Sequence, residues 1–254
     1  MKKIFILSAV LLLACFSKAQ DYSDPVSEGE IVVEKPIDLA QNYRDRRNRY
    51  GILFSVNYEK FSPSDYLSII QNKTFNEVSA GGSIPVMGVE FGIKFNFSLG
   101  SATALLGYAR GTFTDDAKNV DQISAKITKA DINFTLDNLM SEPWVAPYAQ
   151  IGLHQIDWTE SSRDGVGVLK EESFITDWKL NYKAGLLFQL NWLENSIDPN
   201  THNNGLTSSG LQNTYLDIFY VSYAEPNEVA TVGGQSGEAN LASSNFGVGL
   251  KLEF

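Results

Sequence analysis

The last ten residues of the chain alternate strictly between apolar and polar or small side chains. Every second residue from Phe246 to Phe254 is apolar, and glycines and charges fill the positions between them. Because successive side chains of a β-strand point to opposite faces, this segment predicts a strand with one wholly apolar face. The other face mixes glycines with the opposite charges of Lys251 and Glu253, which suits a crowded interior better than open solvent.

The same alternation recurs along the chain from Tyr50 onward. The predicted strands are 50–59, 89–99, 102–113, 129–136, 145–153, 180–192, 216–220 and 245–254. The third has ambiguous parity, because Leu105 and Leu106 are both apolar. An even number of short antiparallel strands is typical of a single-chain bacterial barrel. The expected fold class is therefore all-β, an antiparallel up-and-down transmembrane β-barrel of eight strands.

The predicted connections differ in length. Polar stretches at 60–85, 114–121, 159–177 and 224–242 follow the odd strands, whereas a tight turn at Gly100-Ser101 and the short stretch 137–143 follow even ones. With both chain ends in the periplasm, the long connections would be extracellular. The link 193–210 is long for a periplasmic turn.

The first 19 residues form a predicted secretory signal peptide. A basic start at Lys2 and Lys3 precedes an apolar run, and small residues stand just before a cleavage point after Ala19. In the alternative interpretation, the run ending in Cys15 resembles a lipobox and Cys15 is lipidated. Cys15 is the only cysteine, so cleavage after Ala19 would leave no disulfide and no thiolate metal site.

The chain without residues 1–19 is strongly acidic. It keeps 17 of the 20 Lys and Arg residues against 30 Asp and Glu, a net charge of -13. This argues against nucleic acid as a partner, because phosphate neutralisation needs basic side chains. Residues 20–48 are expected to be a periplasmic tail or plug, with 49–254 as the barrel domain. The arginines at 44, 46, 47 and 49, around the boundary, could contact lipid phosphates or pair with acids of residues 20–48.

A terminal aromatic residue that closes an alternating ten-residue segment resembles the C-terminal assembly signal of bacterial outer-membrane β-barrels. The resemblance is to this superfamily, and Phe254 carries it. It implies location in the cell outer membrane of a Gram-negative bacterium, contact with outer-membrane lipid, and recognition of the C-terminal strand by the barrel-assembly machinery.

The four tryptophans are spaced in a way that fits two membrane interfaces. Trp144 and Trp158 flank the fifth predicted strand and Trp178 and Trp192 flank the sixth, fourteen residues apart in each pair. Aromatic rings with a polar atom favour membrane interfaces. We therefore expect these four residues and Phe254 to be interfacial. The competing interpretation is that the tryptophans cap a soluble core.

The predicted inward positions carry charges of both signs. The expected interior set is Glu90, Lys94, Asp131, Lys183, Asp217 and Lys251, with Glu59, Lys129, Glu253 and Arg110 as further members. An eight-stranded barrel is just wide enough for side chains to fill it. Opposite charges should pair there, because an unpaired buried charge is costly. The consequence is a plugged barrel, and the alternative is a narrow ion or proton path.

Signals for chemistry are weak. His154, with Asp157, Ser161 and Ser162 nearby in sequence, is the only candidate for a base that activates a hydroxyl, and His202 lies in the link 193–210. Neither histidine has a spacing known from outer-membrane lipid deacylases or acyltransferases. We expect no enzyme activity, no cofactor and no metal site, and Gly233–Gly237 is predicted to be a loop tip.

The function expected from the sequence is a structural or surface-interaction role, with acidic extracellular loops on a barrel filled by side chains. The alternatives are a narrow channel or carrier for small or hydrophobic molecules and, third, a lipid-modifying enzyme. A soluble sandwich or lipocalin-like barrel would instead bury the apolar face that the barrel prediction assigns to lipid.

Overall fold

The computed structural model describes one compact unit within residues 37–254. The described residues are 42–68, 70–71, 73–79, 81–115, 121–163, 167–191, 210–224, 229–232, 235–238 and 240–254. The predicted signal peptide with Cys15, most of the predicted tail, Trp192, His202 and Gly233-Gly234 lie outside them.

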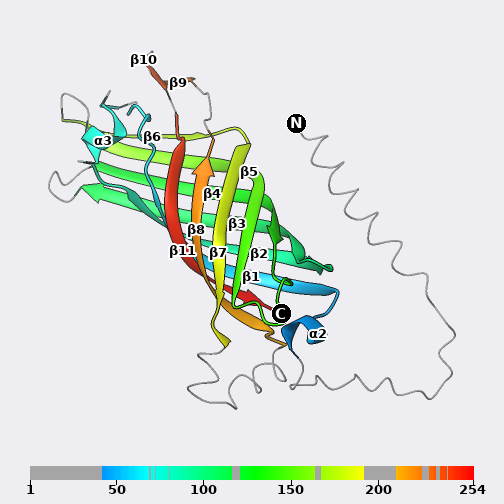
Figure 1. Cartoon of the computed structure of the whole chain (residues 1–254). Helices are drawn as coiled ribbons and strands as arrows, with labels where there is room; N and C mark the ends of the chain where they lie inside the picture. Colours follow the sequence, from blue (N-terminus) through cyan, green and yellow to red (C-terminus); the bar gives the residue numbers. More distant parts are fainter. Residues whose placement is uncertain are drawn as a thin grey trace, which may run out of the picture. The chain divides into compact units, whose positions relative to one another are not determined.

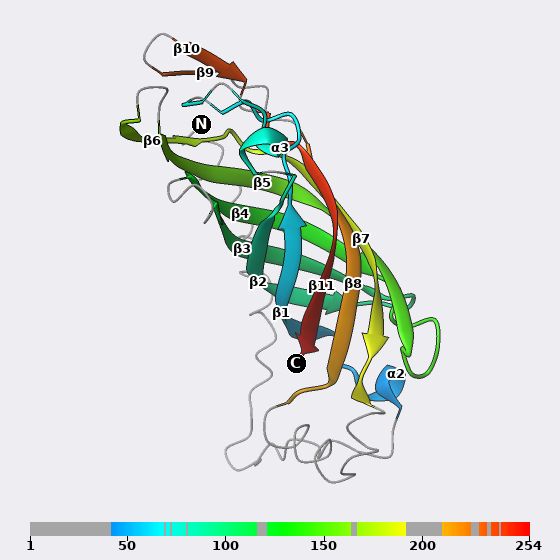
Figure 2. The same ribbon diagram turned by 90° about the vertical axis from the view of Figure 1, so that its left-hand side faces the viewer.

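Eight long strands close into an antiparallel barrel (Figures 1 and 2). They are β1 (Tyr50–Phe61), β2 (Ile84–Asn96), β3 (Ser101–Asp115), β4 (Asp121–Thr135), β5 (Val145–Arg163), β7 (Lys179–Gln189), β8 (Asn213–Tyr223) and β11 (Ser243–Glu253). Each pairs with the next in chain order, and β11 pairs with β1, with Phe54 opposite Leu252. The prediction of an eight-stranded up-and-down barrel is confirmed.

The described part of the chain also has three short strands and two short helices. β6 (Leu169–Ile175) pairs with the last part of β5, from Asp157 to Arg163. It lies on the same edge of β5 that pairs with β7 from Val145 to His154. β9 (Val229–Val232) and β10 (Gln235–Glu238) form a separate two-stranded sheet. The helices among the described residues are α2 (Tyr43–Arg46) and α3 (Phe75–Val78). Across the described ranges, no helix is long and apolar enough to cross a membrane.

The barrel has two distinct ends. Figure 1 shows α2 beside the C-terminus at one end and α3 at the opposite end. The backbone groups of Ile52 and Phe254 exchange hydrogen bonds of 2.9 and 2.8 Å near the first of these ends. We call them the α2 end and the α3 end.

Several strands extend further toward the α3 end than the sequence predicts, β4 and β5 by the most. β5 continues past Leu153 to Arg163, and β4 begins at Asp121 instead of 129, so parts of the predicted loops 114–121 and 159–177 are strand. The reason is that outward residues in these extensions, such as Gln155 and Asp157, are polar. The alternation itself continues there with the opposite phase, because the apolar residues Ile123, Ile127 and Ile156 are buried inside the barrel. A prediction that places every apolar residue on the outer face therefore ends the strand too early.

Between the α2 end and the strand extensions, the outer wall is apolar and the inner wall is mostly polar. On β3 the ambiguous pair is resolved: the side chain of Leu106 points outward and is 69% exposed, while Leu105 is 3% exposed inside. Phe91 on β2 is likewise 53% exposed, and its inward neighbour Glu90 is buried. This arrangement is the inverse of a water-soluble protein, so the outward face requires apolar surroundings.

Candidate functional site

A network of buried charges fills the middle of the barrel. Glu90 of β2 lies at its centre, because strand parity turns it inward. Its carboxylate is 3.3 Å from Lys183 Nζ across the lumen and 3.8 Å from Lys129 Nζ, and it accepts a 3.1 Å hydrogen bond from Ser55 Oγ. The Glu90 carboxylate therefore offsets part of the positive charge of both lysines.

Asp217 of β8 extends this network. Lys183 Nζ and Lys251 Nζ each lie 3.7 Å from its carboxylate, and Tyr148 donates its phenol hydrogen at 2.8 Å. Aromatic faces support the two ammonium groups, with Lys183 4.1 Å from the centre of the Phe219 ring and Lys251 4.2 Å from that of Tyr148. Cation–π contacts of this kind are strongest where water is excluded.

A second group lies toward the α3 end. Lys129 Nζ is 3.7 Å from Glu59 and donates to the Tyr223 hydroxyl at 3.0 Å, and that hydroxyl in turn donates to Glu59. The ring of His154 packs edge-on against Tyr223, with 4.9 Å between ring centres.

Asp131 is held by amides rather than by a close cation. Gln150 Nε2 donates to its carboxylate at 2.8 Å and Asn181 Nδ2 at 2.9 Å. The six residues of the predicted interior set are all buried, and ion pairs join four of them, Glu90, Lys183, Asp217 and Lys251. Lys94 pairs with Asp137 and Glu253 instead. Arg110 is a correction: it is exposed on the outer wall, because β3 turns its odd-numbered residues inward.

The α2 end is closed by residues that precede the first strand. Lys94 Nζ lies 2.6 Å from both Asp137 and Glu253, and Arg47 contacts Asp137 at 2.9 Å. The Tyr43 phenol donates to Glu253 at 2.7 Å. Burial and the nearby Glu253 carboxylate raise the pKa of Tyr43 well above its usual value, so the phenol remains a protonated donor.

An apolar cluster closes the α3 end. The connection from β1 to β2 folds over the barrel mouth and packs Tyr66 and Phe75 on the indole of Trp158, at ring-centre distances of 4.8 and 6.5 Å. Tyr66 and Ser68 also donate to the buried Glu160 carboxylate, at 2.6 and 2.5 Å. Hydrogen bonds and aromatic packing therefore hold this connection against β5.

The predicted interfacial aromatics divide into different environments. Trp144 is 52% exposed at the α2 end, and Trp178 and Phe254 are half-buried. The outward position expected for Trp158 is wrong, since its side chain is fully buried inside the mouth. Even-numbered residues of β5 point inward, and Trp158 is one of them. Trp144 comes before the strand begins, so the alternation of β5 does not fix its direction. Equal spacing of the tryptophans along the sequence therefore did not mean that they lie on the same face of the barrel wall.

The residues near His154 do not assemble into a catalytic group. His154 points inward and is fully buried, whereas Asp157 points outward and pairs with Lys126 at 2.9 Å. Ser162 Oγ accepts a hydrogen bond from Gln71 instead. His154 and Asp157 lie on opposite faces of β5, so the candidate base and the candidate acid are on different sides of the barrel wall. In the part of the chain that the structure describes, no group of three His, Cys, Asp or Glu residues could hold a metal ion.

Sequence reasoning missed three residues that close the α2 end. Tyr43 and Arg47 lie in the predicted tail, and Asp137 lies in a predicted turn. Arg47 pairs with this distant Asp137 and also donates to the carbonyl of Phe97, so neither sequence interpretation of the arginines foresaw its partner. An aromatic residue and a basic residue four positions apart, Tyr43 and Arg47, just before the first strand, were the available signal.

No protein-family model and no curated protein sequence matches the chain. Solved structures with a similar fold include neisserial surface protein A, with 14% identity over 82% of this chain and 98% of that one and a TM-score of 0.42. Ail, the attachment invasion locus protein of Yersinia pestis, shows 12% identity over 81% and 97%, with a TM-score of 0.38. The outer membrane protein OprG from Pseudomonas aeruginosa shows 9% identity over 80% and 95%, with a TM-score of 0.45. Such distant likeness carries no argument about ligands or partners.

The geometry of the chain itself assigns its surroundings. In a bilayer only helices and closed barrels satisfy every backbone amide and carbonyl, and in this chain eight strands close with an apolar band outside and charges inside. The chain is a small closed β-barrel whose outer face suits the hydrocarbon of a membrane.

Proposed function

We propose that this barrel is a membrane anchor whose closed interior does not conduct and whose α3 end acts as a surface-interaction region outside the cell. The observation that carries the proposal is the closure of the lumen at three levels. The central network of Glu90, the cluster at Lys94 and the packing around Trp158 each occupy the cross-section. Chain-end placement supports the orientation, with the α2 end in the periplasm.

The region beyond the apolar band is built as a sheet. Outward apolar residues of β5 end at Leu153, and the strand then continues for ten residues to Arg163. At roughly 3.3 Å per residue and a tilt of about 40°, this extension rises about 25 Å. β6 pairs along it from Asp157 to Arg163 and adds a further strand to the protruding sheet.

This region has an acidic character. Residues 159–177 contain five acidic residues and two basic ones, and Glu171 is exposed on β6. Complementary charge raises the rate and specificity of association more than the final affinity. We therefore assign a basic surface as the preferred partner. At the other end, β11 with Phe254 would be the strand that the barrel-assembly machinery recognises.

Two measurements test the proposal. Purified barrels, verified as folded by a shift between unboiled and boiled samples on a detergent gel, should give no conductance steps in planar lipid bilayers. Stepwise conductance of the wild-type chain would overturn the anchor role and favour the narrow-channel alternative.

The surface role is tested with polylysine as a basic probe. Cells that display the wild-type chain should bind it more than cells with Glu171→Gln/Glu172→Gln. Asp65→Asn, which removes an exposed acid from the β1–β2 connection, is the control and should have little effect. Equal binding by all three would refute the assignment of the interaction to β6.

A further inference from the structure

A hollow on the lipid-facing wall arises from strand register. In one row across four strands, Phe134 stands opposite Ala149, Ala149 opposite Ala184, and Ala184 opposite Tyr220. All four side chains point outward, since they share the parity of the exposed residues. Two small residues between two large rings leave a depression at the centre of the row.

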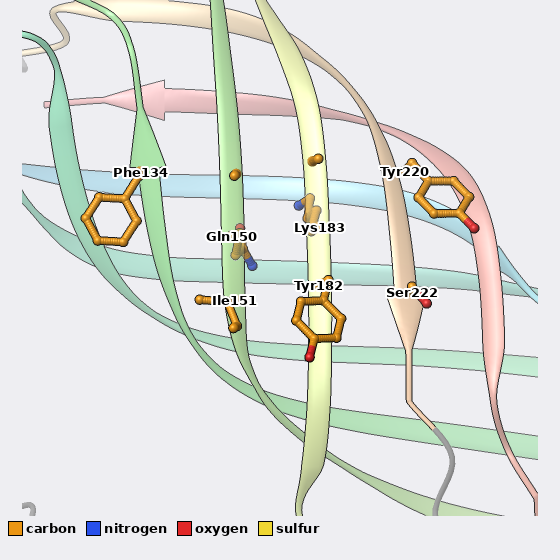
Figure 3. A pocket seen from close by; sticks show the side chains of 9 residues that line it. Phe134, Gln150, Ile151, Tyr182, Lys183, Tyr220 and Ser222 are labelled. Carbon is orange, nitrogen blue, oxygen red and sulfur yellow. The ribbon is translucent and has the colours of Figure 1, made fainter.

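The depression has a volume of about 280 Å³. Its floor is formed by Ala149 and Ala184, and Ile151 and Tyr182 of the neighbouring row stand beside it. Figure 3 shows Phe134, Tyr182 and Tyr220 around it, while Lys183 lies behind the strands. At roughly 30 Å³ for a water-sized group, this space holds about nine methylene groups.

The floor lies at mid-height of the apolar band. On β5 the outward apolar residues run from Val145 to Leu153, and Ala149 is the central one. A ligand in this position is surrounded by hydrocarbon and must itself be apolar there, since no water would solvate a polar group.

Polar groups border the hollow on one side only. Toward the α3 end, Ser222 stands opposite Tyr182, and its hydroxyl is 2.8 Å from that of Ser244. Toward the α2 end, the next outward pair is Pro147 and Leu186, which have no polar side-chain atoms. The site therefore suits a molecule with a polar group toward the α3 end and a hydrocarbon tail toward the bilayer centre.

We propose that this hollow binds one acyl chain of a lipid A molecule from the outer leaflet, with the tail over Ala149 and Ala184 and an ester or hydroxyl group near Ser222 and Tyr182. The choice of leaflet rests on the orientation proposed above. A phospholipid of the inner leaflet would approach from the α2 end, where no side-chain hydroxyl borders the hollow.

The test is retention of lipid by the purified, folded barrel in native mass spectrometry. We expect one lipid A molecule to remain bound under conditions that remove phosphatidylethanolamine. The variant Ala149→Leu/Ala184→Leu fills the floor and should lower the bound fraction at least tenfold. Ala104→Leu, an outward alanine on β3 that does not line the hollow, is the matched control and should retain lipid like the wild type.

A second variant covers the case in which the double leucine variant fails to fold. Ser222→Ala removes the hydroxyl without adding bulk, and should weaken retention about tenfold, the amount of one hydrogen bond worth about 1.4 kcal/mol. Equal retention of lipid A by the wild type and by the variants of the hollow would overturn the site. Preferential retention of phosphatidylethanolamine would overturn the outer-leaflet source. Neither result depends on whether the barrel conducts.

Discussion

The phenol of Tyr43 donates a hydrogen bond of 2.7 Å to the carboxylate of Glu253, a residue 210 positions later in the chain. Tyr43 precedes the first strand and Glu253 ends the last one, so this contact lies at the seam where β1 and β11 close the barrel. Lys94 Nζ contacts both groups, at 3.0 and 2.6 Å. The segment before β1 thus takes part in the closure of the barrel.

Removal of the Tyr43 hydroxyl should destabilise the barrel. In Tyr43→Phe, Glu253 loses a donor and Lys94 loses an acceptor in a buried place, and we expect a loss of about 1–3 kcal/mol in the free energy of unfolding. Urea unfolding in detergent micelles measures it. Tyr50→Phe, at a ring that is 62% exposed, is the control and should change little. An unchanged midpoint in Tyr43→Phe would show that the contact does not stabilise the closure.

Stability should depend on pH through Asp137. Burial alone would raise its pKa, but Lys94, Ser101 and Arg47 together hold the pKa below the ordinary value of 3.8. A depressed pKa in the folded state means that the stabilisation is complete above pH 3.8 and is lost as the pH falls through the folded value.

The measurement compares wild type and Asp137→Asn in urea unfolding at several pH values. Their difference in stability should be constant from pH 7 to 5 and shrink below 3.8. Asp65→Asn, in the exposed β1–β2 connection, serves as the control. A difference that grows as the pH falls would contradict a depressed pKa of Asp137 in the folded state.

Glu90 should be the most sensitive acid of the central network. Glu90→Gln leaves Lys183 and Lys129 without their shared carboxylate, and breaking a buried pair costs about 3–5 kcal/mol. We expect a low yield of heat-modifiable barrel. Adding Lys183→Met should restore part of it, because one uncompensated charge is then gone. No recovery in the double variant would mean that Lys183 is not the group left unpaired.

The closure of the α3 end should depend on Trp158. Trp158→Ala removes the ring on which Tyr66 and Phe75 pack, at a cost of about 3–5 kcal/mol. Trypsin should then cut at Lys73 faster than in the wild type, because the β1–β2 connection loses its support. Trp144→Ala, at an exposed position, should leave the rate unchanged. Equal cleavage in Trp158→Ala would show that hydrogen bonds to Glu160 alone hold the connection.

Parity of the strands was available from the sequence alone. Alternation in 50–59, 89–99 and 245–254 correctly separated outward apolar residues from inward charges, because a strand side chain has only two directions. It also indicated that these charges share one enclosed space. The eight-stranded barrel followed from this pattern.

Only the tertiary structure decided which charges meet. Lys94 pairs with Asp137 and Glu253, and Glu90 pairs with Lys183 across the lumen. Parity assigns a face to each residue, but not the relative height of strands, which depends on hydrogen-bond register accumulated around the barrel. For the same reason no sequence pattern indicated that Trp158 would lie under a folded connection, or that Ala149 and Ala184 would stand side by side beneath two aromatic rings.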